Sequence, residues 1–444
     1  MGYHITMNLS GFQPYLGYSP AQFQTYQLAK LKTFVSQIRV RSRYYRKILA
    51  PYPEIRTYEQ FETLPWLDQD ALRNTDPDEM RGAAWSAITT VSASSGTTGK
   101  SKLVLWTRSA LREEAKWNAL EYLLMGVTPA SRLAMLMPLE LSRCPSYLEA
   151  CRVIGAFSVP FGRIRNDVEM DNVISKMHLL NVSHIHGSTS RLLSLTQRAK
   201  ELGYDLKKDF AVTHLFGSAL FVSANTRAFL EEEWGAEFFD CYGANEVSFI
   251  SGECSRHDGL HLLPGISYVE VVDPKTRKRI TDSTTPGEIL VTNFSNSGSP
   301  LLRYRIGDTG TITYRPCSCG LAFPRLFVRG RTAFTLYIGG TKLDAYDIDS
   351  VLGKFPAMSN NYQAVIQHAG SSYDVRFRVE SLHYGRQTPA ETDALLRALE
   401  SASYEINLKV REGNVRFTLE LVPLGSLPRS DRDKILDQVL YQEG

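Results

Sequence analysis

The sequence predicts an α/β protein with a large N-terminal domain, residues 1–330, and a small C-terminal α/β domain, residues 331–444. The length of 444 residues exceeds one ordinary domain, so two or three domains are expected. Strand-like apolar runs alternate with helical patterns over residues 133–212, as in a mixed layer of strands and helices. Strict alternation of apolar residues over 373–379 and 415–421, with a helical stretch between them, indicates the second, smaller domain.

The balance of charges excludes two classes of partner. With 50 basic and 47 acidic residues the formal charge is only +3, which predicts neither a nucleic acid nor a membrane surface as partner. No apolar run approaches the roughly 18 residues that span a membrane, and no secretory pattern opens the chain, so we expect a cytoplasmic enzyme. Whether the protein forms a homodimer is left open.

Helical signals mark both ends of the chain. Ser19 and Pro20 form a helix start, a cap followed by a first-turn proline. Four apolar residues then recur on one face at helical spacing: Leu28, Leu31, Val35 and Ile38. At the other end, we expect a final helix from about Ser430.

The stretch of residues 92–102 is the predicted functional centre of the chain. Small hydroxyl residues, Gly96, Gly99 and two lysines are concentrated there, between strand-like runs over 88–91 and 103–106. Glycine allows the backbone to approach an anion closely, and N–H groups, hydroxyls and lysines can all donate to it. The pattern indicates a phosphate-binding loop.

Two other interpretations of this stretch remain open. A Walker-type phosphate loop requires a glycine where Ser94 stands and a helix after the loop, where the sequence predicts a strand. A solvated polar turn is the ordinary explanation for a cluster of serine, threonine and glycine. The stretch alone does not decide between that turn and a phosphate site.

Several later segments combine a strand with an irregular loop. Residues 138–147 form an apolar irregular segment, which is either core or the lining of a substrate pocket. Strand-like runs end in glycine turns within 214–219 and 238–246, and charges cluster at a strand end over 302–308. Loops at strand ends often carry ligands.

The cysteines include two close pairs of metal-ligand residues. Cys254 and His257 are separated by two residues, and Cys317 and Cys319 by one. These ligand types and spacings suit a tetrahedral zinc ion, and four protein ligands would make the site structural because no position is left for chemistry. The alternative is a pair of reduced surface turns, with His261 as a competing ligand.

In their order along the chain, these motifs resemble those of the adenylate-forming enzymes, a superfamily of acyl-CoA synthetases, carrier-protein adenylation domains and luciferases. The matching segments are residues 94–100, 217–219, 242–246 and 304–308, then Gly330-Arg331 with Gly339-Gly340 and residues 347–349. The branch that the chain resembles most is the phenylacetate-CoA ligase family, through Tyr44-Tyr45, Leu64-Pro65 and residues 259–261, 317–320 and 425–430. The resemblance implies a large adenylate-forming domain and a small mobile C-terminal domain.

The resemblance also implies a site for ATP and Mg²⁺. Glu246 would bind Mg²⁺ and Asn245 would face the α-phosphate. Tyr242 would stack on adenine, and Asp308 would bind the ribose hydroxyls. The other implied nucleotide-binding residues are Ser95, Gly96, Thr97, Thr98, Gly99, Lys100, Gly217, Ser218, Ala219, Asp240, Gly243 and Arg331. The implied substrate pocket is lined by Leu141, Tyr147, Gly217 and Ala244, and the expected catalytic residues are Lys434, Glu246 and Asn245.

Three positions depart from the family pattern. Asn245 stands where the superfamily has threonine or serine, although its amide still offers a donor to a phosphate. Ala333 stands where the family has an acidic hinge residue, at the point about which the small domain is thought to rotate. The expected adenylation lysine is either Lys434, displaced by one position, or absent.

The implied reaction is that of an AMP-forming ligase. A small carboxylic acid, aromatic or otherwise apolar, would attack ATP to give an acyl-adenylate and pyrophosphate, and the acyl group would pass to CoA. A carboxylate is ionised at neutral pH, so its attack needs like charges neutralised and in-line geometry rather than a base. One alternative delivers the acyl group to a carrier-protein thiol or an amine, and another is a non-catalytic nucleotide-binding relative.

Overall fold

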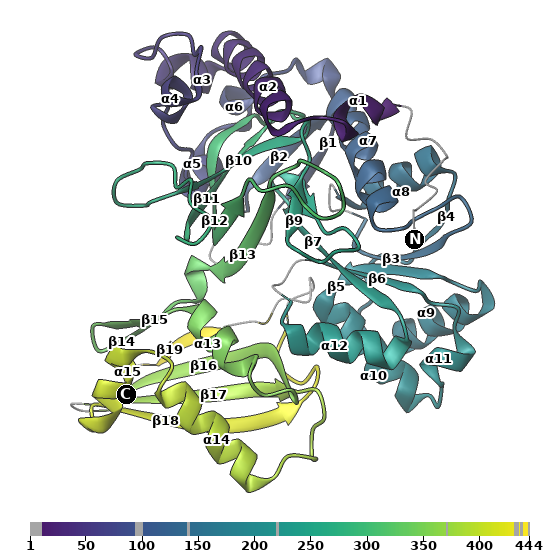
Figure 1. Ribbon diagram of the computed structural model, residues 1–444, viewed down its shortest axis with the longest axis vertical. Helices are drawn as coiled ribbons and strands as arrows, with labels where there is room; N and C mark the ends of the chain where they lie inside the picture. The colour runs from purple at the N-terminus through teal and green to yellow at the C-terminus, as the bar shows by residue number, and fades with distance from the viewer. Residues whose placement is uncertain are drawn as a thin grey trace. The chain divides into compact units, whose positions relative to one another are not determined.

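The structure is a computed structural model that describes residues 11–93, 101–139, 143–218, 222–369, 372–429, 435 and 438–442 (Figure 1). It divides into two compact units, one of Met1–Gly162 with Phe239–Val328 and one of Arg163–Phe238 with Arg329–Gly444. Both contain sheets and helices, so the predicted mixed α/β class is confirmed. The division into domains at residue 330 stays a prediction. In the described ranges, no helix has the length and apolar character to cross a membrane.

The first unit begins with a group of helices. They are α1 Gln13–Leu16, α2 Pro20–Arg41, α3 Arg43–Ile48, α4 Tyr58–Glu62, α5 Gln69–Asn74 and α6 Pro77–Met80, followed by the short 3₁₀ helix Trp85–Ala87. The predicted helix start is confirmed, because Ser19 and Gln22 form a reciprocal capping box at α2. Leu31, Val35 and Ile38 of α2 are buried, as their helical spacing predicts.

Strands of the first unit form most of one sheet. Their order is β10-β11-β12-β13-β9-β8-β7, in which β7 is Glu237–Ala244, β8 Ser248–Gly252, β9 Leu260–Leu262, β10 Ser267–Val272, β11 Gly287–Asn293, β12 Leu301–Thr313 and β13 Arg325–Arg331. The same unit holds the parallel pair β3 Arg132–Leu136 and β4 Phe157–Pro160, with helices α7 Arg108–Leu124 and α8 Arg143–Ile154.

A separate antiparallel hairpin consists of β1 Ile88–Ala93 and β2 Leu103–Thr107. Two strands on either side of the predicted phosphate loop are therefore confirmed. Residues 94–100 of the loop itself lie outside the described residues.

A buried ion pair joins two strands of the first unit. Arg303 of β12 donates from Nε and Nη2 to the two carboxylate oxygens of Glu270 on β10, at 3.1 and 3.0 Å, and both side chains are 1% exposed. Arg303 Nη1 donates to the carbonyl oxygen of Leu64 at 2.8 Å and also to that of Glu62. Burial raises the pKa of Glu270, and the guanidinium opposes that rise. One side chain thus connects the helical segment to the sheet.

The first part of the second unit alternates helices and strands, as predicted for residues 133–212. Its elements are α9 Asp167–Leu179, β5 His184–Ser188, α10 Thr189–Glu201, α11 Leu206–Asp209, β6 His214–Ser218 and α12 Ala224–Trp234. Strands β5 and β6 are parallel neighbours. The connection between them runs through α10, as parallel pairing requires.

The second part of this unit contains a small sheet of order β18-β17-β16-β19. Its elements are the 3₁₀ helix Thr332–Phe334, β14 Leu336–Ile338, β15 Thr341–Leu343, α13 Ala345–Leu352, β16 Met358–Ala369, β17 Ser372–Ser381, α14 Pro389–Glu400, α15 Tyr404–Arg411, β18 Val415–Pro423 and β19 Val439–Gln442. Val375, Phe377 and Phe417 contribute to one apolar core with residues of the helices, which confirms the alternating strands. The expected final helix is wrong at residues 439–442, which pair with β16 as a parallel strand.

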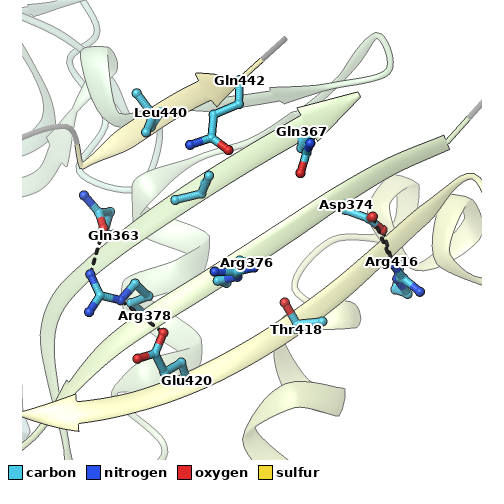
Figure 2. Close-up of a pocket in the computed structure, with 11 residues that line it drawn as sticks. Gln363, Gln367, Asp374, Arg376, Arg378, Arg416, Thr418, Glu420, Leu440 and Gln442 are labelled. Carbon is cyan, nitrogen blue, oxygen red and sulfur yellow. Dashed lines mark hydrogen bonds and ion pairs between the residues drawn. The ribbon is translucent and has the colours of Figure 1, made fainter. Parts of the chain in front are cut away.

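The other face of the small sheet is polar and hollowed, with a volume of about 510 Å³ (Figure 2). Arg378 pairs with Glu420, and Arg416 with Asp374, across β17 and β18. These are partly exposed pairs on a water-facing surface, so each contributes little to stability. Among the residues that the structure describes, none of the predicted site residues lines this hollow.

Side chains of α12 fasten the two parts of the second unit together. Asn225 Nδ2 donates to the carbonyl oxygens of Leu352, Phe355 and Met358 at 3.1, 2.9 and 3.3 Å. Thr226 donates to Asn360 at 3.3 Å. Because the last carbonyls of a helix lack partners within the helix, Asn225 acts as a distant cap at the end of α13.

Asp349 on α13 is a half-buried acid with one carboxylate oxygen removed from water and unpaired among the described residues. Its Oδ1 has no hydrogen-bond partner among the described residues, and burial raises its pKa to about 8. The folded protein therefore retains this proton at neutral pH, whereas the unfolded chain releases it near the ordinary aspartate pKa of 3.8. Since the folded state binds the extra proton between these values, this group lowers stability as pH rises through that window.

Replacing Asp349 with asparagine should remove this pH dependence. We expect the Tm of Asp349→Asn, relative to the parent protein, to rise steadily from pH 5 to pH 8, because asparagine has no proton to lose. Thermal unfolding followed by circular dichroism at several pH values measures the difference. Asp393→Asn, on the exposed side of α14, is the matched control. A Tm difference that stays constant with pH would contradict the assignment.

Candidate functional site

A buried carboxylate and a lysine meet beyond the end of β7. Glu246 is 7% exposed, and its Oε1 accepts a hydrogen bond from Tyr304 Oη on β12 at 3.1 Å. Lys102 forms an ion pair with the same oxygen and also contacts Tyr304 Oη and Gln69 Oε1, each at 3.2 Å. Lys102 leads directly into β2, so the cluster joins the end of the predicted phosphate loop to the predicted magnesium ligand.

Tyr242 and Asp308, both assigned to the nucleotide site, are also in contact. Tyr242 Oη on β7 donates to Asp308 Oδ2 on β12 at 2.7 Å. Asp308 is buried, and Gly307 before it has φ of +87°, a conformation that favours glycine. The backbone conformation at Gly307 therefore brings the Asp308 carboxylate within hydrogen-bonding distance of the Tyr242 hydroxyl.

The turn after β7 holds the remaining predicted residues of this group. A Cβ on Gly243 would lie 2.2 Å from the carbonyl oxygen of Ser248, so no larger residue fits there without a shift. Ala244 is buried, Asn245 is half-buried, and the backbone N–H of Asp240 donates to Glu253 at 2.9 Å. A close turn therefore brings Tyr242 and Glu246 to one end of the sheet.

Other predicted site residues lie in the second unit. Gly217 of β6 packs so closely on Phe238 that a Cβ would lie 2.1 Å from the ring carbon Cζ. Ser218 Oγ donates to the carbonyl oxygen of Gly187 at 3.2 Å. Arg331 is half-buried at the end of β13. Their roles toward a nucleotide stay predictions.

Tyr147, a predicted pocket residue, is buried in α8 against α7. Its Oη donates to Glu121 Oε2 at 2.9 Å, and its ring lies 5.0 Å from that of Tyr122. A role in lining a pocket stays a prediction. The remaining predicted residues lie outside the described part of the chain: Ser95, Gly96, Thr97, Thr98, Gly99, Lys100, Leu141, Ala219 and Lys434.

Three cysteines and one histidine form a compact cluster in the first unit. The ligand atoms of Cys254, His261, Cys317 and Cys319 all lie within 4.8 Å of one another. Cys254 Sγ is 3.9 Å from Cys317 Sγ, and Cys319 Sγ is 3.5 Å from His261 Nε2. The hydrogen bond between Cys254 and Cys319 raises the pKa of Cys254 to about 11 and lowers the pKa of Cys319, so Cys319 ionises more readily than Cys254.

The histidine of this cluster corrects the predicted set. The structure places His261, not His257, with the three cysteines. His257 has φ of +49° in a turn, and its Nδ1 lies 3.1 Å from Glu253 Oε2. His261 is in β9, which brings its side chain to the cluster although it is farther from Cys254 in the chain.

Sequence reasoning also missed three contributors to the Glu246 cluster. The sequence offers Lys102 as a donor to an anion but not as a partner of Glu246, it shows Tyr304 only as part of a motif, and it carries no signal at Gln69. A lysine at the start of a strand that flanks a phosphate loop was the available clue for Lys102. The contacts of Tyr304 and Gln69 depend on strand packing that spacing does not reveal.

Comparisons with known proteins agree with this fold. No protein-family model matches the chain. Among solved structures, 2-hydroxyisobutyryl-CoA ligase in its postadenylation state matches with a TM-score of 0.80 at 20% identity, covering 97% of this chain and 92% of that chain. An anthranilate-CoA ligase matches with a TM-score of 0.58 at 15% identity, covering 79% of this chain and 66% of that chain. The fold is that of the adenylate-forming acyl-CoA ligases.

Curated sequences narrow the resemblance to one family. The phenylacetate-coenzyme A ligase of Thermus thermophilus is 26% identical over 445 residues, covering 96% of this chain and 98% of that protein. The enzyme of the same name from Escherichia coli is 22% identical over 396 residues, covering 85% of each. The predicted resemblance to the phenylacetate-CoA ligases is confirmed.

The close packing of Gly217 on Phe238 gives a test of site geometry. Gly217→Ala should destabilise the protein by about 1–3 kcal/mol, because the added methyl overlaps the ring and forces a shift. Adding Phe238→Leu should make the double variant more stable than the sum of the two single effects predicts. Urea unfolding of all four proteins measures the coupling, and strict additivity would show that the two residues do not touch.

Proposed function

We propose that the protein activates a carboxylic acid with ATP to give an acyl-adenylate and pyrophosphate, and then transfers the acyl group to CoA. The observation that carries this proposal is the contact set of Lys102, Tyr304 and Glu246 in a chain that resembles phenylacetate-CoA ligases over almost its whole length. We further propose an aromatic or otherwise apolar acid, by analogy with the phenylacetate and anthranilate in the names of its relatives.

The residues of the Glu246 cluster suit the charges of this reaction. A carboxylate and the phosphates of ATP repel each other, so cations beside the reacting groups lower the barrier. Glu246 offers a carboxylate oxygen of the kind that Mg²⁺ prefers, and Lys102 offers an ammonium group for a phosphate. When bound, Mg²⁺ would neutralise phosphate charge. In the absence of nucleotide, Lys102 and Glu246 neutralise each other's charge, and this attraction offsets the desolvation cost of burying the two charged groups.

Tyr242 and Asp308 suit the nucleoside. The ring of Tyr242 offers a flat surface for adenine, and a buried carboxylate at Asp308 can accept hydrogen bonds from ribose hydroxyls. Their mutual hydrogen bond of 2.7 Å fixes the ring beside the carboxylate. We propose the predicted loop residues, from Ser95 to Lys100, as ligands of the β- and γ-phosphates.

The acyl acceptor has alternatives to CoA. A carrier-protein thiol or an amine would accept the acyl group after the same first step. The departures from the family pattern at Ala333 and Lys434 are the reason to test these two acceptors beside CoA. A non-catalytic nucleotide-binding relative would keep Tyr242 and Asp308 without turnover. The experiment below separates these cases.

Acid-dependent exchange of pyrophosphate into ATP tests the first step. With a panel of aryl and alkyl acids, we expect exchange by the parent protein and a loss of about 10²-fold in Glu246→Gln, because the carboxylate charge is removed. Glu288→Gln, which breaks the pair with Arg305 on β12, is the matched control and should retain exchange. Mass analysis with and without CoA identifies the acceptor. Absence of exchange with every acid would contradict the proposal.

We also propose that Cys254, His261, Cys317 and Cys319 bind a structural zinc ion. Zinc–sulfur bonds of about 2.3 Å at tetrahedral angles separate two sulfurs by about 3.8 Å. The separation of Cys254 and Cys317 Sγ atoms, 3.9 Å, fits this value. Three of the four ligands are buried, so an ion there would tie β9 to the loop before β13 rather than meet a substrate.

Metal content separates the two histidines. Protein purified without added chelator should contain about one zinc per chain by plasma mass spectrometry, because four ligands complete the coordination. His261→Ala should lose most of this metal, whereas His257→Ala, which removes a histidine only four positions away, should keep it. Equal zinc content in the two variants would contradict the assignment of His261.

A further inference from the structure

One glutamine side chain of the first unit reaches both halves of the proposed nucleotide site. Gln69 is the first residue of α5. Its Oε1 accepts a hydrogen bond from Lys102 Nζ at 3.2 Å, and its Nε2 donates to the carbonyl oxygen of Ile306 on β12 at 2.9 Å. Lys102 pairs with Glu246, and Ile306 lies two residues before Asp308. The amide of Gln69 therefore connects the Glu246 cluster to the backbone that carries Asp308.

Backbone contacts with β12 fix the position of Gln69. The N–H of Leu67 donates to the carbonyl oxygen of Arg303 at 3.2 Å, and the N–H of Arg305 donates to the carbonyl oxygen of Leu67 at 3.0 Å. Asp68, the N-cap residue of α5, accepts a hydrogen bond from Arg305 Nη1 at 2.9 Å. Because both residues before Gln69 are attached to β12, its side chain starts from a fixed point beside that strand.

Gly307 leaves the space that this amide occupies. A Cβ at Gly307 would lie 2.7 Å from Gln69 Nε2, so a larger residue there would displace the amide. The positive φ of Gly307, +87°, favours glycine independently. Gln69 thus contacts the backbone turn that presents Asp308, and it also bonds to the carbonyl group just before that turn.

The contact with Lys102 suits a lysine that has to meet a phosphate. The ammonium group has three N–H donors, and it faces three acceptors among the described residues: Glu246 Oε1, Tyr304 Oη and Gln69 Oε1. If a metal ion engages Glu246, Tyr304 and Gln69 still orient the ammonium, and its third donor points in a defined direction. An amide oxygen is a neutral acceptor, so it does not compete with a phosphate as a carboxylate would.

We propose that Gln69 is a positioning residue for ATP, which directs Lys102 toward a phosphate and holds the backbone from which Asp308 meets the ribose. The two contacts use different atoms of one amide, Oε1 for the lysine and Nε2 for the carbonyl of Ile306. This inference rests on the proposed function.

Two substitutions that keep roughly the size of glutamine test this role. Gln69→Met removes both hydrogen bonds, whereas Gln69→Glu keeps an acceptor for Lys102, adds a negative charge and removes the donor to Ile306. Gln24→Met, at an exposed glutamine of α2, is the matched control. Calorimetry with Mg²⁺ present measures the affinity of each protein for ATP, 2′-deoxy-ATP and adenosine, and thermal unfolding checks that each variant is folded.

We expect Gln69→Met to lower the preference for ATP over adenosine about tenfold, because Lys102 loses a hydrogen bond that directs its charge. The preference for ATP over 2′-deoxy-ATP should fall about threefold, because Asp308 loses support for its backbone. Gln69→Glu should lower the first preference at least as much, since its charge holds Lys102 away from a phosphate.

A purely structural role for Gln69 gives a different pattern. General loosening of the site would weaken binding of all three ligands equally in Gln69→Met, and this result would overturn the proposal. Unchanged preferences in both Gln69 variants, or an equal change of preference in Gln24→Met, would overturn it too.

Failure of the proposed function is distinguishable from failure of this inference. A parent protein that binds ATP but shows no acid-dependent pyrophosphate exchange would overturn the proposed reaction, and the preferences among the three ligands would still confirm or overturn the role of Gln69. A parent protein that binds no ATP would overturn both. Intact exchange with unchanged preferences in Gln69→Met would overturn the role of Gln69 alone.

Discussion

The buried pair of Arg303 and Glu270 is the constraint on which the described part of the proposed nucleotide site depends. It fixes β12 to β10 and, through the carbonyls of Glu62 and Leu64, to the N-terminal helices. The residue after Arg303 is Tyr304, which contacts Glu246, and Asp308 lies farther along the same strand. Removal of one partner from a buried pair costs about 3–5 kcal/mol, so the position of β12 is strongly determined.

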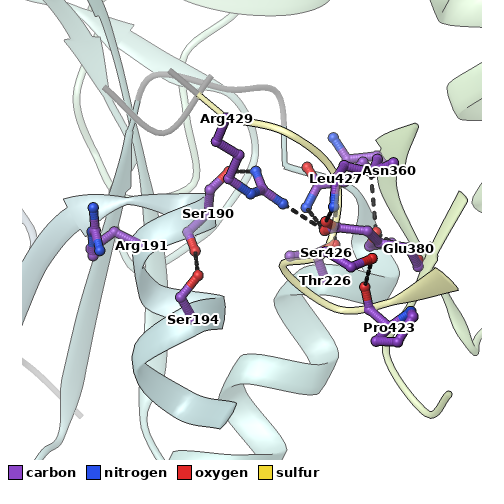
Figure 3. A network of polar contacts seen from close by, with 12 residues as sticks. Ser190, Arg191, Ser194, Thr226, Asn360, Glu380, Pro423, Ser426, Leu427 and Arg429 are labelled. Carbon is purple, nitrogen blue, oxygen red and sulfur yellow. Dashed lines mark hydrogen bonds and ion pairs between the residues drawn. The ribbon is translucent and has the colours of Figure 1, made fainter. Parts of the chain in front are cut away.

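Buried carboxylates recur through the protein, and their partners indicate what each one does. Glu270 and Glu380 face guanidinium groups and organise the backbone around them, as Figure 3 shows for Glu380. Glu246 faces the flexible ammonium group of Lys102, which can turn toward an arriving phosphate more easily than a planar guanidinium can. Asp349 lacks any such partner among the described residues and carries a proton instead. Glu270 and Glu380 thus pair with planar guanidinium groups, whereas Glu246 pairs with the more flexible ammonium group of a lysine.

Local patterns predicted local structure well, and contacts between distant segments less well. The capping box at Ser19, the hairpin around residues 94–100 and the alternating strands of the small sheet follow from short-range preferences. The predicted Cys/His cluster differs at one residue, because a Cys-x-x-His spacing favours His257 whereas the position of β9 brings His261 beside the three cysteines. The prediction of a final helix is wrong at residues 439–442 because these residues complete the edge of a sheet, and tertiary pairing outweighs helical spacing in so short a segment.

The cap that Asn225 places on α13 also determines how the chain can be divided. The sequence places the domain boundary at residue 330. However, the carbonyl oxygens of Leu352, Phe355 and Met358 accept hydrogen bonds from Asn225 on α12, which lies more than a hundred residues earlier in the chain. A fragment that starts at residue 331 would lose that donor and also Ser190 on α10, which accepts a hydrogen bond from Arg429 (Figure 3). The compact unit is therefore discontinuous in the sequence, and fusion or domain exchange at residue 330 would separate residues that contact each other.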